Sequence, residues 1–375
     1  ANIGYYWWSN DIGGHMFGRH DDEMAARWVQ LGCFSPINRL HSTDSVFNSK
    51  EPWRFSRDAR ATMNAHLRLR HRLVPYLYTW ARRARTEGVG PVRPLYHDFP
   101  TQMGAYAHRT QFLFGDLVIV PIVHPADPVS TLAREDAWLP RGTWFDVVTG
   151  RRYECPDAAG RDLTLSRPLD RLPVLARAGA VVVGAEDLGE AAGDNPRRLS
   201  VIVVPGADGE FVLEEDDGSP EPGEDAVVRT RFALAWDEAG GAEDGAGGTA
   251  RLTIEQTGPD GVVPAEREIT VHLLCVDDAS LRAGRVGIGS GAMTDNTGVA
   301  GEVRSGAGGG TGIGGGTGAS NVGNRSGADG GGDGSGASGG AETGGRTGSG
   351  ARGREPVVTA RAADGFALGP GVDIA

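Results

Sequence analysis

The sequence predicts an α/β segment at the start of the chain, followed by two all-β domains. An aromatic run over Ile3–Trp8 leads to Asp11 and then Gly13-Gly14, which is typical of a buried strand that delivers a carboxylate to a glycine loop. Residues 57–87 carry the strongest helical periodicity in the chain. From Gln111 onwards the apolar runs become short and strand-like.

Length and composition favour a multi-domain protein that acts on neither nucleic acid nor membranes. The chain has 375 residues, of which 39% are hydrophobic, enough for two or three domains with real cores. Its 37 Lys and Arg against 49 Asp and Glu give a net charge of −12, without a basic block that could follow a phosphate backbone. No apolar run approaches the roughly 18–20 residues of a membrane span, and the first residues do not resemble a signal peptide.

Three cysteines, Cys33, Cys155 and Cys275, lie far apart and without Cys-x-x-Cys spacing. They predict neither a disulfide framework nor a zinc site, and a reducing cytoplasm is the expected location. The chain opens at Ala1-Asn2, without methionine and inside an expected core strand. We therefore expect a fragment whose upstream part is missing.

Residues 1–100 form the predicted α/β part. After the glycine loop we expect a helix over 21–32 with an acidic start, and then a second short strand over Cys33–His41. His41 follows Asp11 by 30 positions, about the length of one βαβ unit. If the two strands are adjacent and parallel, both side chains emerge at the rim where barrels and open sheets bind ligands.

The longest helix is predicted over Arg57–Glu87, and Pro75 is expected to kink or divide it. Its apolar positions recur at helical spacing among many arginines. These positions are Met63, Leu67, Leu69, Leu73, Leu77 and Trp80.

Two β-rich domains follow, the first over residues 101–195 and the second over 196–283. Their apolar runs are short and separated by turn residues. The runs are Phe112–Val123, Trp144–Val148 and Leu172–Val183 in the first domain, and Leu199–Gly206, Phe211–Leu213, Phe232–Trp236 and Ile269–Leu274 in the second.

Residues 284–353 are dominated by Gly, Ala, Ser, Thr and Asn. This composition cannot bury enough apolar surface to offset the ordering entropy, so we expect disorder. Val357–Ala360 then reads as one last strand, which makes the tract an insertion and returns residues 354–375 to the distal domain.

Asp11 is the sharpest candidate for chemistry, since a carboxylate at the mouth of a strand can bind hydroxyls, orient a base or transfer a proton. An Asx turn or helix cap is the simpler alternative. Trp7 and Trp8 point to opposite faces of a strand, so one can pack inside while the other offers a platform for a sugar ring. The alternative is that both indole rings simply pack in the core.

His41 can hydrogen-bond a ligand hydroxyl as a neutral imidazole, or be a structural histidine. Arg39 either pairs with a carboxylate such as Asp11 or stays at the surface. No metal is expected, since His66 and His71 lie five positions apart on a helix and do not share a face well. No organic cofactor is expected either. The acidic turn that ends at Gly218 is read as solvated.

Together these residues resemble glycoside hydrolase family 31, which contains α-glucosidases, α-xylosidases and related retaining enzymes. The resemblance covers most of residues 3–220, in the right order. The matching stretches are Trp8–His15, Arg27–Gly32, Phe34–Pro36, Arg39–Ser42, Leu69–Tyr78, Phe114–Pro121, Leu172–Gly179 and Pro205–Gly209.

The resemblance implies that residues 1–100 are the seventh and eighth βα units of a (β/α)₈ barrel, followed by a proximal and a distal β-sandwich. His41 matches the family's histidine after the eighth strand, which binds the sugar in the −1 subsite. Asp11 matches an aspartate at the same pocket, and His15 a position near the neighbouring subsite. Trp8 and Arg39 complete the expected substrate-binding residues.

The family's two catalytic aspartates, a nucleophile in Trp-x-Asp-Met-Asn-Glu and an acid/base in Gly-Asp-Asn, have no counterpart in the predicted barrel part. Retention needs two carboxylates about 5–5.5 Å apart. We therefore expect no catalytic residue in this chain and no activity from it alone. The nucleophile and the acid/base are expected upstream of Ala1.

The resulting prediction for the parent protein is a cytoplasmic α-glucosidase that acts on short α-glucosides through a covalent glycosyl-enzyme intermediate. An α-xylosidase or another α-glycosidase of the family is the nearest alternative. A non-catalytic carbohydrate-binding module, with Trp7, Trp8 and His41 around a sugar, is the alternative from another class. The expected partner is an oligosaccharide or α-glucoside, and the oligomeric state is not predicted.

Overall fold

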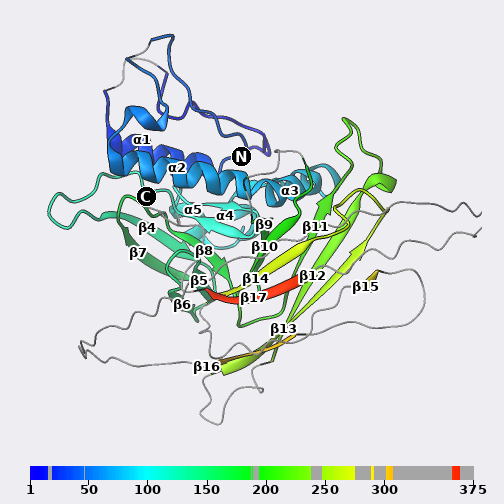
Figure 1. Ribbon diagram of the computed structural model, residues 1–375. Coiled ribbons are helices and arrows are strands. Elements are labelled where there is room, and N and C mark those ends of the chain that lie inside the picture. The colour runs from blue at the N-terminus through cyan, green and yellow to red at the C-terminus, as the bar shows by residue number, and fades with distance from the viewer. Residues whose placement is uncertain are drawn as a thin grey trace, which may run out of the picture. The chain divides into compact units, whose positions relative to one another are not determined.

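The computed structural model describes residues 1–15, 19–45, 47–186, 188, 194–237, 247–274, 289–290, 301–306 and 357–363. All of them belong to one compact unit of residues 1–306 and 354–375 (Figure 1). Apart from the short strands β15 (Gly289–Ser290) and β16 (Gly301–Gly306), the tract predicted to be disordered, 284–353, lies outside the described residues.

Three long helices form the first part of the chain: α1 (Asp22–Cys33), α2 (Arg57–Arg72) and α3 (Val74–Thr86). The Asp21 carboxylate caps α1 by accepting a hydrogen bond from the Met24 backbone N–H at 2.8 Å. The predicted division of the second helix is confirmed. It breaks at Leu73, because Pro75 lacks an N–H and is tolerated only in the first turn of α3.

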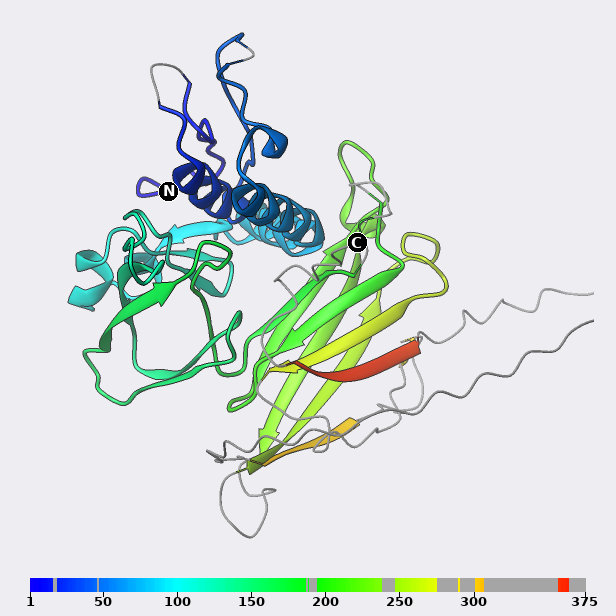
Figure 2. The same cartoon turned by 60° about the vertical axis from the view of Figure 1, so that its left-hand side comes forward.

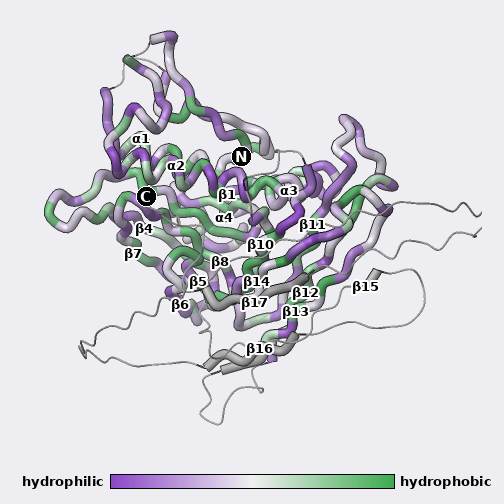
Figure 3. Tube along the Cα trace, in the orientation of Figure 1, coloured by the Kyte–Doolittle hydropathy of each residue, from purple (hydrophilic) through white to green (hydrophobic). Residues whose placement is uncertain are grey.

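Helices α1 and α2 pack side by side through a small apolar cluster that contains Ile12, Val29 and Met63 (Figures 1 and 2). In Figure 3 hydrophilic and hydrophobic residues alternate along these helices, as one-sided burial requires. None of the helices in the described part of the chain is both long and apolar enough to cross a membrane.

The buried strand predicted over Ile3–Trp8 is wrong. Residues 3–10 carry no strand, and Ile3 and Tyr5 are 90% and 63% exposed. Of the strand predicted over Cys33–His41, the structure forms only one parallel bridge, between Leu40 and Ile12. Parallel strands are stable inside a sheet because neighbours on both sides satisfy their backbone groups. Here each segment has one neighbour, and no closed barrel exists among the described residues.

The next part of the chain folds into a six-stranded sheet of order β1-β2-β3-β8-β5-β6 and a separate β4-β7 pair. Short helices α4 (Leu95–Asp98) and α5 (Met103–Ala107) precede most of these strands. The strands are β1 (Val92–Pro94), β2 (Phe112–Phe114), β3 (Leu117–Ile119), β4 (Ala133–Leu139), β5 (Gly142–Asp146), β6 (Arg152–Cys155), β7 (Arg161–Arg167) and β8 (Val174–Arg177).

The last part contains a four-stranded sheet of order β17-β14-β10-β9 and a five-stranded sheet of order β11-β12-β13-β15, with β16 on β13. Strand β17 runs parallel to β14 along its whole length, as Figure 2 shows, and so joins the end of the chain to this sheet. The remaining strands are β9 (Val181–Ala185), β10 (Arg198–Val203), β11 (Gly209–Glu215), β12 (Val228–Asp237), β13 (Gly247–Thr257), β14 (Glu268–Leu274) and β17 (Val357–Ala363).

Helix α3 lies at the centre of the main core, where it packs on β9 and β11. The ring of Tyr76 is fully buried and stacks on Phe211 with centroids 5.1 Å apart. Its hydroxyl accepts the backbone N–H of Asp116 at 2.8 Å, and burial raises the pKa of Tyr76 well above its usual range. This core fixes the helical layer on the sheets.

A second anchor joins α1 to the turn after β7. Arg27 is buried, and its guanidinium donates to the carbonyls of Pro168 and Arg171 at 3.0 Å each. Gln30, one turn further along α1, donates to the Leu169 carbonyl at 2.7 Å. Helix α1 is therefore held by polar contacts to a turn that lies about 140 positions further along the sequence.

Candidate functional site

The single parallel bridge decides which side chains face the site. The Ile12 N–H donates to the Arg39 carbonyl at 3.1 Å, and the His41 N–H donates to the Ile12 carbonyl at 3.2 Å. Ile12 and Leu40 pack into the cluster between α1 and α2. Because alternate residues of an extended segment point to opposite sides, Asp11, Arg39 and His41 emerge together on the other side.

The glycine loop then brings His15 back towards Asp11. Gly13 and Gly14 have φ angles of +92° and +82°, in the region that favours glycine. The Gly14 N–H closes the turn by donating to the Asp11 carbonyl at 2.7 Å. A Cβ on Gly13 would lie 2.6 Å from the side chain of Lys50, a flexible chain that can move away, so the positive φ is the stronger reason for glycine here.

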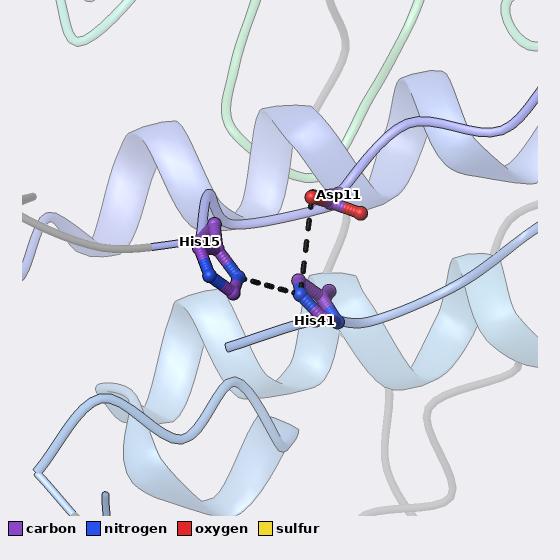
Figure 4. Close-up of side chains that lie close together, drawn as sticks. All are labelled: Asp11, His15 and His41. Carbon is purple, nitrogen blue, oxygen red and sulfur yellow. Dashed lines mark hydrogen bonds and ion pairs between the residues drawn. The ribbon is translucent and has the colours of Figure 1, made fainter. Parts of the chain in front are cut away.

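Four of the five predicted site residues come together here, and Figure 4 shows three of them. The Arg39 guanidinium donates a short hydrogen bond to Oδ1 of Asp11. Nε2 of His41 lies 3.8 Å from Oδ2 of Asp11 and 2.7 Å from Nδ1 of His15. The two imidazoles are almost parallel, with an interplanar angle of 11° and centroids 4.8 Å apart.

The electrostatics keep Asp11 ionised. The hydrogen bond from Arg39 lowers the pKa of the Asp11 carboxyl, and the neighbouring positive charges act in the same direction. Because His15 and His41 bond nitrogen to nitrogen, one ring donates and the other accepts, so at least one imidazole is neutral. The cluster thus offers a carboxylate acceptor beside imidazole groups, which suits the recognition of vicinal hydroxyls.

The fifth predicted residue, Trp8, is not part of this cluster. Its half-buried ring packs against the main core, and its indole Nε1 has no partner among the residues that the structure describes. Trp7 is 42% exposed. The alternation of a strand does not apply to the two indoles, because residues 3–10 form no strand.

Two positioning residues were not singled out from the sequence. Trp28 of α1 donates from Nε1 to the Asn10 side chain at 2.7 Å, next to Asp11. Arg70 of α2 donates to the carbonyls of Cys33 at 3.1 Å and Pro36 at 2.7 Å, in the turn that leads to Arg39 and His41. Both residues lie in stretches that resemble the family, but the sequence did not reveal their contacts. No local pattern links Trp28 to Asn10 across 18 positions, or Arg70 to its acceptors across 34 and 37 positions.

A pocket adjoins the cluster. Its walls come from the glycine loop, from the first turns of α1 and from the segment before α2. His15 is the residue shared by the pocket and the cluster, and Trp28, Phe47 and Lys50 also line the pocket. A ligand held by Asp11 and His41 can extend past His15 into this space.

The second carboxylate of a retaining glycosidase is not found in this cluster within the described residues, where Asp11 is the one acidic member. The tripeptide Gly-Asp-Asn does occur once, at residues 193–195, but in the connection between β9 and β10. There Asn195 donates to the carbonyls of Asp216 and Val262 at 2.8 Å each. This copy of the tripeptide therefore supports the distal sheets and does not belong to the barrel part.

Comparison with known families gives two matches in succession. Residues 1–80 match the TIM-barrel domain of glycosyl hydrolases family 31, and residues 88–182 match the C-terminal domain of the same family. The cluster of Asp11, His15, Arg39 and His41 lies in the barrel match.

The individual proteins that resemble this chain include glycosidases. The chain is 32% identical over 247 residues to an α-xylosidase of Saccharolobus solfataricus, covering 63% of this chain and 31% of the relative. It is 30% identical over 210 residues to α-glucosidase 2 of Bacillus thermoamyloliquefaciens, covering 56% and 25%. A family 31 dextranase of Flavobacterium johnsoniae, solved with glucose, matches with a TM-score of 0.55 at 25% identity, covering 67% and 30%. The chain thus spans about a third or less of each relative.

Proposed function

Because the chain belongs to glycoside hydrolase family 31, we propose that it forms part of the sugar pocket and the accessory β-domains of a retaining α-glycosidase. Its relatives are glycosidases, and a carbohydrate substrate is consistent with the glucose held by the dextranase. The preferred reaction is hydrolysis of terminal α-glucosidic bonds in short saccharides, through a covalent glycosyl-enzyme intermediate. The barrel part is proposed to be the seventh and eighth βα units, and the two β-rich parts to be sandwiches.

The observation that carries this proposal is the cluster itself. Asp11 is kept charged by Arg39, so it can accept hydrogen bonds from two sugar hydroxyls, while His41 beside it supplies a donor or acceptor. These groups bind and orient the sugar. The nucleophile and the acid/base are proposed to come from residues outside this sequence, so the chain alone should not hydrolyse a glycoside.

Chromogenic nitrophenyl glycosides test the proposal. The 375-residue chain is expected to release no nitrophenol above the blank, and the full-length parent to favour the α-glucoside over the α-xyloside. Faster xyloside hydrolysis would establish the α-xylosidase instead. A full-length parent that binds glucose but cleaves neither substrate would establish the carbohydrate-binding module.

His41→Ala in the full-length parent is expected to lower kcat/KM by at least tenfold, because a hydrogen bond to the sugar in the transition state is lost. An unchanged kcat/KM would contradict the role of His41. We also propose a cytoplasmic location for the parent, on the ground that Cys33 and Cys155 are free and buried.

A further inference from the structure

The donor atoms of Asp11, His15 and His41 converge on one small volume. One carboxylate oxygen and one nitrogen of each imidazole all lie within 4.8 Å of one another. In the described part of the chain, this is the one group of three or more His, Cys, Asp or Glu side chains with such a spacing. We propose that these three residues form a site for a transition-metal dication, with Zn²⁺ as the preferred ion.

The donor set points to this class of ion. Two imidazoles and one carboxylate are a common set of three protein ligands for zinc, with the fourth position left open. Imidazole nitrogen also suits Cu²⁺ and Ni²⁺, whereas Mg²⁺ and Ca²⁺ require oxygen ligands. The site is therefore expected to reject the alkaline-earth ions.

The observed distances fall on both sides of the spacing expected around a bound ion. Zinc–ligand bonds of about 2.0–2.1 Å in a tetrahedron place the ligand atoms roughly 3.3 Å apart. The 2.7 Å between the two imidazoles must therefore lengthen, and the 3.8 Å between His41 and Asp11 must shorten. The widest separation among the three donor atoms, up to 4.8 Å, must shorten most. His15 is exposed and His41 half-buried, so neither ring is locked by packing. The ion would take the place of the proton between the two rings.

Arg39 is compatible with such an ion. Its guanidinium holds Oδ1 of Asp11, whereas Oδ2 is the oxygen nearer to His41. Carboxylates that ligate a metal are commonly oriented by a hydrogen bond of this kind. Its positive charge lowers the affinity for a cation, but Arg39 is itself half exposed and screened by water.

The ion and the sugar would exclude each other, since both use Asp11 and His41. This exclusion rests on the proposed function, whereas metal binding by the chain does not. Zinc is accordingly expected to inhibit the full-length parent by competing with the glycoside, in contrast to a metal that takes part in the reaction.

Isothermal titration of the full 375-residue chain with ZnCl₂ tests the site, with MgCl₂ and CaCl₂ as comparison ions. We expect one zinc ion per chain and no heat of binding from the other two. His15→Ala and His41→Ala should each weaken zinc binding by at least tenfold. The matched control is His124→Ala, an exposed histidine that pairs with Glu135 in the following domain, and it should bind zinc like the unmodified chain.

Co²⁺ gives a readout that a folding defect alone does not mimic. Tetrahedral Co²⁺ absorbs visible light, and the intensity should fall in His15→Ala and Asp11→Asn while circular dichroism stays unchanged. Absence of zinc binding by the unmodified chain, or equal affinity in His15→Ala, would overturn the site. Zinc binding that a glucoside does not displace in the full-length parent would instead contradict the sugar-binding role of Asp11 and His41.

Discussion

The loops that carry the site and the core around α3 are held in different ways. Asp11 and His41 depend on one β-bridge, a glycine turn and side-chain hydrogen bonds from α1 and α2. Tyr76, by contrast, is enclosed by aromatic rings and apolar side chains of two sheets. The candidate site thus lies on loops held by few backbone hydrogen bonds, where side chains can adjust to a ligand.

The same contrast separates the aromatic residues. Tyr5 in the opening segment is 63% exposed, whereas Tyr76 is completely buried. Both lie in aromatic-rich stretches, and hydropathy alone does not distinguish them. Burial depends on whether another part of the chain covers the segment.

The largest expected effect comes from this pair. Tyr76→Ala removes a buried ring and its hydrogen bond to Asp116, so it should lower the free energy of unfolding by about 3–5 kcal/mol. Tyr5→Ala is the matched control, and its free energy of unfolding should stay within about 0.5 kcal/mol of that of the unmodified chain. Urea denaturation measures both. Comparable losses would mean that the opening segment is packed as tightly as the core.

The next prediction concerns the link between the two regions. Arg70→Ala leaves the carbonyls of the turn at Cys33–Pro36 without their donor, and should cost about 1.5–3 kcal/mol. Arg68→Ala, on the exposed side of the same helix, should cost less than about 0.5 kcal/mol. Chemical shifts of His41 should move only in the Arg70 variant. Equal losses in both variants would contradict the anchoring role.

A smaller effect is expected at the glycine turn. Gly14→Ala forces a Cβ onto a φ of +82° and should cost roughly 1–2 kcal/mol. Gly88→Ala, after α3, has a φ of +72° and open space around it, so its backbone cost should be similar. The two should differ at the His15–His41 hydrogen bond, as seen by nitrogen NMR of the imidazoles. An undisturbed pair in Gly14→Ala would show that the turn does not position His15.

The smallest expected effect on stability is that of Arg39→Gln, because the ion pair with Asp11 is exposed. Arg39 lowers the folded-state pKa of Asp11, so the pair contributes stability above the unfolded pKa and loses it as pH falls through the folded pKa. Carbon NMR should therefore find a higher Asp11 pKa in Arg39→Gln. A pKa that does not rise would exclude the guanidinium as the cause.

Much of the local structure could be predicted. The acidic start of α1, the division of the long helix at Pro75 and most strand runs follow from capping, proline chemistry and hydropathy, which act over a few residues. The predicted runs do not include strands β4, β6, β7 and β13, because polar residues interrupt these strands on their exposed sides.

The spacing of one βαβ unit also anticipated that Asp11 and His41 lie together, and the parallel bridge between Ile12 and Leu40 brings them there. The strands predicted over Ile3–Trp8 and Cys33–His41 did not form, because a strand depends on partners that its own sequence does not contain. For the same reason, the sequence could not exclude Trp8 from the cluster.

By itself, the sequence determined the helices, the glycine turn and the residue types available for chemistry, since these depend on neighbours within a few positions. Only the tertiary structure decided that His15 meets His41, that Arg39 pairs with Asp11 instead of staying at the surface, and that Arg70 supports the turn before Arg39. These contacts join residues 26 to 37 positions apart. Their geometry depends on the bridge between Ile12 and Leu40 and on how α1 packs on α2, neither of which a local pattern encodes.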